Sequence, residues 1–294
     1  MLRALAARLV FAVLLVVLAF AGAYVLIAAA PGSDQVGADE GLSRDQRARE
    51  RARLGLDRPV TIRVADRLRR LAVLDLGTSR QYGRPVRSLV IERASATVQA
   101  GLLALLLAVA LGIPAGVVAT RTRWPALRQL IATVSVALLS MPPLVLALAL
   151  AAAAATTAVP SLLVTVVALA LPAAALLERL QARALSEALQ ERCLHAARAR
   201  GVPDRRVTWR HAWPLSVPAV LGVGGVIGSH LVSGSLAVEL VTSRPGLGLL
   251  TSQALMTRDA DLAAGCAGAA ALLVGAVTFA ADALQLWLDP RTTT

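Results

Sequence analysis

The stretch from Cys193 to Pro218 reads CLHAARARGVPDRRVTWRHAWPLSVP, a basic, polar block in a chain that is 57% hydrophobic. From Glu187 to Arg200 the residues are good helix formers with no Gly or Pro, which predicts a helix. Gly201 lies where such a helix would end in a left-handed turn. Pro203 can open a second helix at its first position. The block therefore predicts two short helices joined at a glycine.

Arginine side chains crowd the predicted turn: Arg198, Arg200, Arg205, Arg206 and Arg210. A helix, a glycine hinge and a second helix form a compact knob, which can transmit a push as a rigid body. Short loops rich in Lys and Arg mark the cytoplasmic side of a membrane protein. We interpret the knob as a cytoplasmic loop on which a soluble partner docks.

The block resembles a motif of bacterial ABC importers. Their membrane subunits carry a loop with Glu-Ala-Ala, three residues, Gly, nine residues, then Ile-x-Leu-Pro. Ala196, Ala197, Gly201 and Pro214 fall on that spacing, while a histidine, His195, takes the place of the Glu. His211 and Trp213 likewise replace the Ile and the Leu. The stretch AARARGVPDRRVTWRHA is most similar to the peptide, opine and nickel branch of this family.

The resemblance extends over nearly the whole chain, through LGLDRPV, DLGTS, ELVTSRPGLG, ALMTRD and DALQLWLDPR. It departs from the family at Thr242, where an aromatic is usual, near Ala260, where a Pro is usual, and at Gln285, where a Tyr is usual. These departures concern local packing and substrate details.

The resemblance implies a type I importer permease that forms the translocation pathway for peptides or a related small solute. Nickel chelates, glutathione and opines are close alternatives. It further implies two permease subunits, two ATP-binding subunits and an extracytoplasmic substrate-binding protein. The residues that would form the coupling loop to the ATPase are His195, Ala196, Ala197, Arg198, Gly201, His211 and Pro214.

Composition places the chain in a bilayer. Only 3% of its 294 residues are aromatic, and several apolar runs are long enough to span about 30 Å of hydrocarbon. The formal net charge is +12, and all the basic residues are arginine. Without a Lys, the chain has no P-loop for ATP and no Schiff-base lysine. Because the arginines lie in loops between spans, membrane topology explains the charge better than nucleic acid does.

Six transmembrane helices are predicted, with both termini cytoplasmic in a bacterial inner membrane: residues 9–30, 97–119, 130–155, 156–177, 218–240 and 262–288. The third is expected to break at Pro142-Pro143, since two prolines remove two backbone donors. Glycines in the second and fifth spans are expected to allow close helix contact. The fold class is therefore an all-α integral membrane protein, with the coupling loop between helices four and five.

Three regions follow from this topology. Residues 1–30 are a cytoplasmic start and the first transmembrane helix, although a signal peptide is the rival interpretation. Residues 31–94 are an extracytoplasmic segment, with a short surface helix ending near Gly55 and turns further on. Residues 95–294 are a permease core of five helices, with the coupling loop at 178–215.

Ionisable residues within the spans are candidates for the translocation pathway. His230 lies midway along the fifth span, where it either faces a cavity or forms an interhelical hydrogen bond. Glu239, at the outer end of that span, either meets a cationic substrate or a partner, or is solvated at the interface. Asp282 in the sixth span is expected to pair with an arginine from a neighbouring element.

Two other functional classes remain open. A secondary transporter would carry polar residues in several spans and related broken helices, which most of these spans lack. An intramembrane serine enzyme would need a Ser and His in hydrogen-bonding reach, but Ser229 and His230 are neighbours that diverge by about 100° on a helix. The sequence shows no metal-ligand cluster, so we expect no cofactor, no metal site, no catalytic residue and no enzymatic activity.

Overall fold

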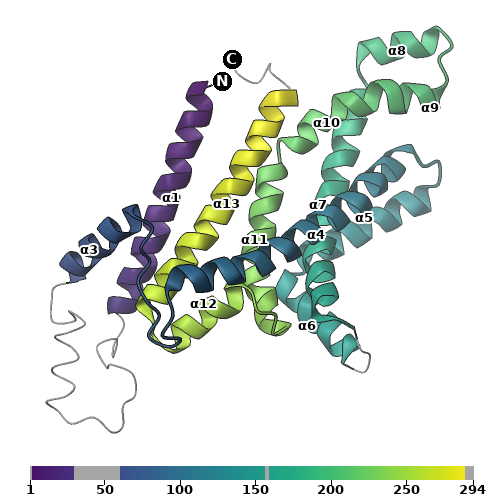
Figure 1. Cartoon of the computed structure of the whole chain (residues 1–294). Coiled ribbons are helices and arrows are strands. Elements are labelled where there is room, and N and C mark those ends of the chain that lie inside the picture. The colour runs from purple at the N-terminus through teal and green to yellow at the C-terminus, as the bar shows by residue number, and fades with distance from the viewer. Residues whose placement is uncertain (1, 30–59, 156–158, 289–294) are drawn as a thin grey trace, which may run out of the picture. The chain divides into compact units, whose positions relative to one another are not determined.

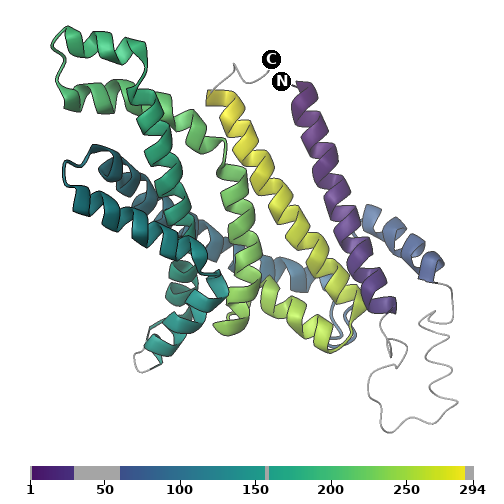
Figure 2. The ribbon, with the colours of Figure 1, turned by 180° about the vertical axis from the view of Figure 1, so that it is seen from behind.

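The computed structural model of the chain describes residues 2–29, 60–155 and 159–288 (Figures 1 and 2). Within these residues the secondary structure is helical, apart from one isolated β-bridge between Thr78 and Pro85. Five helices are long and apolar enough to cross a membrane, and a bent helix pair makes a sixth. The all-helical membrane fold with up to six spans is as predicted.

The described helices are α1 (Leu2–Ala29), α3 (Val60–Ala72), α4 (Val86–Arg121), α5 (Pro125–Ser140), α6 (Pro143–Ala154), α7 (Ser161–Leu189), α8 (Arg192–Ala199), α9 (Asp204–Arg206), the π-helix η1 (Val207–Ala212), α10 (Trp213–Leu221), α11 (Gly224–Val241), α12 (Leu247–Met256) and α13 (Ala260–Leu288). They form two compact units. The first comprises 1–8, 98–244 and 276–294, and the second comprises 9–97 and 245–275.

The first unit is organised around α7, which packs against α5, α6, α10 and α11. Its core is built largely of small side chains such as Ala104, Ala108 and Ala168. Glycines bring α4 close to α7: a Cβ at Gly116 would lie 2.6 Å from the Glu178 carbonyl oxygen. Small residues at a helix contact let the backbones approach in this way, which confirms the prediction for the second span.

The third predicted span is broken at the prolines as expected. The axes of α5 and α6 differ by 101°, with the break at Met141 and Pro142. Pro142 and Pro143 cannot donate backbone hydrogen bonds, so α5 cannot continue through them. The Met141 N–H instead closes α5 on the Leu138 carbonyl, and the Pro142 carbonyl accepts the first hydrogen bonds of α6.

Three helix boundaries in this unit differ from the predictions. The helix predicted over 187–200 is wrong, because α7 ends at Leu189 and α8 starts at Arg192. The break lets α8 turn back and bury Leu194. Pro203 is the N-cap residue of α9, and the first helical position is occupied by Asp204. The predicted fifth span is interrupted after Leu221, and α11 begins at Gly224.

The second unit is built from part of α1, α3, the turns that follow it, the start of α4, α12 and the start of α13. Phe20 and Tyr24 of α1 are buried with Ala264 of α13, and the apolar face of α3 packs on them. The predicted turns are present, with positive φ at Gly77 and Gly83. Neither α3 nor α12 was predicted from the sequence, and the surface helix predicted before Gly55 lies outside the described residues.

Candidate functional site

The predicted turn at Gly201 is a tight helix C-cap. Gly201 has φ +80°, in the left-handed region that favours glycine. Its N–H donates to the Arg198 carbonyl at 2.9 Å, and the N–H of Val202 donates to the Ala197 carbonyl at 3.2 Å. These two hydrogen bonds form the Schellman motif, which satisfies the last carbonyls of α8. The chain then reverses through Pro203 into α9.

The knob, residues 191–214, is anchored on a small apolar core. Leu194 of α8 and Val207 of η1 are buried together with Leu185 of α7 and Val117 of α4. Asp204 accepts a hydrogen bond from Arg198 at 3.2 Å and lies 3.8 Å from Arg121 at the end of α4. The knob is therefore joined to both α4 and α7. A displacement of the knob would be passed to these two helices.

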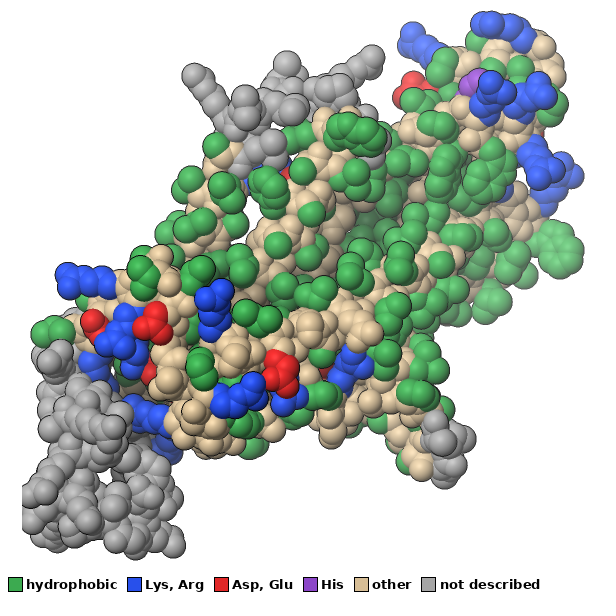
Figure 3. All heavy atoms as spheres, in the orientation of Figure 1, with side chains coloured by type: hydrophobic (Ala, Val, Ile, Leu, Met, Phe, Trp, Pro, Cys, Tyr) green, Lys and Arg blue, Asp and Glu red, His purple; other side chains and the backbone are tan. Residues whose placement is uncertain are grey.

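The predicted coupling residues lie together on this knob. His195, Ala196, Gly201, His211 and Pro214 are exposed, while Ala197 and Arg198 are half-buried. Figure 3 shows arginine side chains gathered over α8 and α9 (the end of the molecule at the upper right). The outer face of the knob is thus basic and accessible.

One exposed residue of the knob was missed. Trp209 is 52% exposed, and its ring lies 5.7 Å from that of Trp213 at an angle of 44°. Aromatic pairs prefer such tilted or offset arrangements. Trp209 lies between the motif positions Gly201 and Pro214, so the motif does not signal it. A large exposed aromatic within a basic surface is suited to an interface with another protein.

His230 lines a cavity of about 310 Å³ at the break between α5 and α6. The lining is mostly apolar, and the polar side chains that line it are Ser140 and His230. Helix breaks at membrane depth are tolerated where they line a cavity or are buried in protein. His230 therefore faces a cavity, which was the first of the two positions considered for it.

Glu239 does not share this cavity. Its side chain is fully buried near the end of α11, so solvation at an interface does not account for it. Asp282 pairs with Arg8, which is the arginine partner that the sequence could not name. Of the two pathway candidates, His230 lines the cavity and Glu239 does not.

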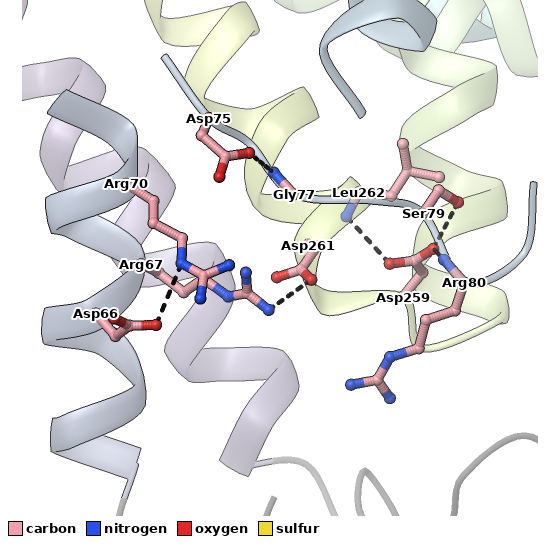
Figure 4. A network of polar contacts seen from close by, with 10 residues as sticks. All are labelled: Asp66, Arg67, Arg70, Asp75, Gly77, Ser79, Arg80, Asp259, Asp261 and Leu262. Carbon is pink, nitrogen blue, oxygen red and sulfur yellow. Dashed lines mark hydrogen bonds and ion pairs between the residues drawn. The ribbon is translucent and has the colours of Figure 1, made fainter. Parts of the chain in front are cut away.

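A polar cluster in the second unit joins the segment after α3 to the start of α13 (Figure 4). Asp259 accepts hydrogen bonds from the Ser79 hydroxyl at 2.7 Å and from the Arg80 N–H at 2.8 Å. Arg67 pairs with Asp261 at 2.8 Å. Burial is the largest single effect and lowers the pKa of Arg67, but Asp261, Tyr24 and Asp66 together outweigh it, so the pKa is raised. The segment around α3 and the segment before α13, both predicted to lie outside the cell, are thus held together.

Replacing Asp259 with Ala is expected to loosen this cluster. The buried Ser79 hydroxyl would lose its acceptor, which costs about 1–3 kcal/mol. The part-buried Arg80 N–H would lose the same acceptor. We expect faster proteolysis within 75–85 in the purified variant. Asp66→Ala is the matched control, because Asp66 is 53% exposed and pairs only with Arg70 among the described residues. Equal cleavage of both variants would contradict this role for Asp259.

Comparison with known proteins decides the family. The family described as the binding-protein-dependent transport system inner membrane component matches residues 112–294, more than half of the chain. The chain belongs to this family. The matched range contains the knob, the cavity at His230 and Glu239. The protein is thus the transmembrane subunit of an ABC importer, as the motif in the knob indicated.

This inner membrane component is similar to named transport proteins over most of its length. A putative peptide transport system permease protein of Brucella suis is 29% identical over 272 residues, which cover 86% of this chain and 87% of the relative. The oligopeptide transport system permease protein OppB of Salmonella typhimurium is 29% identical over 282 residues, covering 89% and 90%. OppB of Escherichia coli K12 is 29% identical over 279 residues.

Proposed function

We propose that this permease couples ATP hydrolysis on separate ATP-binding subunits to the import of peptides or a related small solute. The Schellman turn at Gly201 carries the proposal. It joins two helices through a rigid connection, and the buried joint at Leu194 and Val207 anchors them to α7 and α4. An ATPase that closes on ATP would push this knob, and the push would reach the transmembrane helices.

The proposed assembly contains a second permease subunit, two ATP-binding subunits and an extracytoplasmic binding protein. The basic knob would face the cytoplasm, as would both termini. The cluster around Asp259 supports this topology, because it holds Ser79 and Arg80 next to Asp259, and both segments are predicted to lie outside the cell. That side would be extracytoplasmic and would meet the binding protein. The peptide specificity of the named relatives favours peptides as the solute.

The proposed translocation pathway passes the broken helix. His230 supplies a polar group in an otherwise mostly apolar cavity, which suits transient contact with a passing solute. Glu239 is buried in this conformation, so it would reach a solute only after α11 moves. ATP-driven motion of the knob would provide that movement through α10, which continues from η1.

Site-directed cross-linking tests the docking. A Cys introduced at Ala196, in a Cys193→Ser background, is expected to cross-link to the co-purified ATP-binding subunit with a short bifunctional reagent. Ala196 is exposed on α8, and the background removes the exposed native thiol. Asp66→Cys on α3, outside the knob, is the control and should give no such product. Cross-linking from Asp66 but not from Ala196 would overturn the proposed docking surface.

If His230 lines the translocation pathway, a reagent dissolved in water should reach position 230. In the same background, His230→Cys is expected to react with a small water-soluble thiol reagent, and transported solute should slow this reaction severalfold. The buried native Cys266 should remain unreactive under these conditions. If the reaction at 230 were unaffected by solute at saturating concentration, His230 would be an interhelical contact and not a pathway residue.

A further inference from the structure

A second cavity of about 370 Å³ lies at the surface of the first unit, between the end of α4, α5 and α7. The polar side chains that line it are Thr120, Arg128, Glu178, Arg179 and Ser186. It shares no residue with the cavity at His230. Neither the knob nor the proposed pathway uses it.

The chemical signal in this groove is the buried carboxylate of Glu178. The residue is only 5% exposed, and one of its oxygens, Oε2, accepts a hydrogen bond from the Ser135 hydroxyl at 2.7 Å. Across residues 2–29, 60–155 and 159–288, no Arg or His lies in ion-pair distance of it, and Oε1 accepts no hydrogen bond. A buried carboxylate with one neutral donor is poorly compensated for its lost hydration. The site therefore favours a cation that enters the groove.

The rim of the groove has the opposite charge. Arg128 and Arg179 are both exposed there, and Arg128 also donates to the Thr122 carbonyl at 3.2 Å. Arg179 forms no ion pair with any residue that the structure describes. Guanidinium groups bind phosphate oxygens with strong, often paired hydrogen bonds. The groove thus offers an anionic interior and a cationic rim.

Apolar side chains adjoin the groove along α5. Val136 is next to Ser135, whose hydroxyl donates to Glu178, and it is 45% exposed, which suits contact with a lipid chain. Trp124, just before α5, is 74% exposed, and tryptophans gather at the level of the lipid headgroups. The groove therefore combines a polar pocket at headgroup level with an apolar wall beside it.

We propose that this groove binds a phospholipid whose headgroup carries both a phosphodiester and a primary amine. The ammonium group would bind Glu178, and the phosphate would bind Arg128 and Arg179. An anionic lipid without an amine would leave Glu178 unpaired and near a second negative charge. A trimethylated ammonium group has no N–H to donate. The bound lipid would brace α5 against α7 beside the broken helix.

Lipid binding to the purified full-length chain tests this proposal without any mutation. Native mass spectrometry with matched acyl chains should show tighter binding of phosphatidylethanolamine than of phosphatidylcholine or phosphatidylglycerol, by about tenfold for one charged hydrogen bond. Soluble glycerophosphoethanolamine should bind far more weakly, because it lacks the chains that pack along α5. Equal binding of the three lipids would overturn the proposal.

Two substitutions locate the site. Glu178→Gln should remove the preference for phosphatidylethanolamine, while Arg179→Gln should weaken phosphatidylethanolamine and phosphatidylglycerol alike. Glu187→Gln is the control, because Glu187 is 64% exposed and pairs with Arg183 outside the groove. A folded Glu178→Gln protein with unchanged preference would contradict the assignment. If a dipeptide displaced the lipid, the groove would belong to the solute pathway and the proposal would be wrong.

Discussion

A Gly201→Val permease is expected to reach the membrane and to lose ATP-driven transport. Gly201 has φ +80°, and a β-branched residue there costs about 1–3 kcal/mol. A Cβ at this position would meet no atom within 4 Å, so the effect comes from the backbone conformation and not from a clash. The two helices of the knob would no longer be joined at the angle that the partner requires.

The control for this prediction is Gly201→Asn, because Asn tolerates the left-handed conformation better than other non-glycine residues. We expect Asn to retain most of the transport that Val loses. The measurements are solute uptake in vesicles and the amount of permease in the membrane. Normal uptake by Gly201→Val would contradict the role of the turn. Loss of Gly201→Val from the membrane would show that the turn is needed for folding instead.

The second large effect is expected where α4 crosses α7. A Cβ at Gly112 would clash with the Ala174 carbonyl oxygen, and it would lie 2.8 Å from the Leu177 Cβ. The neighbouring atoms include α7 backbone, which cannot turn away as a flexible side chain can. Gly112→Ala should therefore destabilise the first unit by about 1–3 kcal/mol, as overpacking does in other well-packed cores.

The matched control is Gly101→Ala on the same helix, since a Cβ at Gly101 meets no atom within 4 Å. Thermal unfolding in mild detergent should show a lower midpoint for Gly112→Ala than for Gly101→Ala. The double variant Gly112→Ala with Gly116→Ala should be less stable still, because both positions face α7. Identical midpoints for Gly112→Ala and Gly101→Ala would show that α4 and α7 do not pack in this way.

Local signals in the sequence predicted several features correctly. The left-handed turn could be predicted because only glycine adopts it without strain, and the break in the third span because Pro142 and Pro143 lack backbone donors. The break after Leu189 could not be predicted in this way, since Gln190 and Glu191 are both acceptable in a helix. Burial of Leu194 against Leu185 and Ala188 favours the bend there, and this packing is tertiary.

The elements outside the spans were harder to predict. The apolar positions of α3 recur at helical spacing, as Val64, Leu68 and Leu71 show, but its four arginines made the segment resemble a solvated loop. The bond between Ser79 and Asp259 joins residues 180 positions apart, and no local pattern signals it. No local pattern signals the hydrogen bond between Ser135 and Glu178 either, which lies at the groove between α5 and α7.

We expect this permease to act within an ATP-driven assembly. The most direct test is to purify the tagged chain from its native membranes in mild detergent, identify what accompanies it, and measure uptake after reconstitution. We predict a P-loop ATPase and a second permease in the purified complex, and uptake that requires ATP and the binding protein. Recovery of the chain alone, with uptake driven by an ion gradient and no nucleotide, would contradict the account.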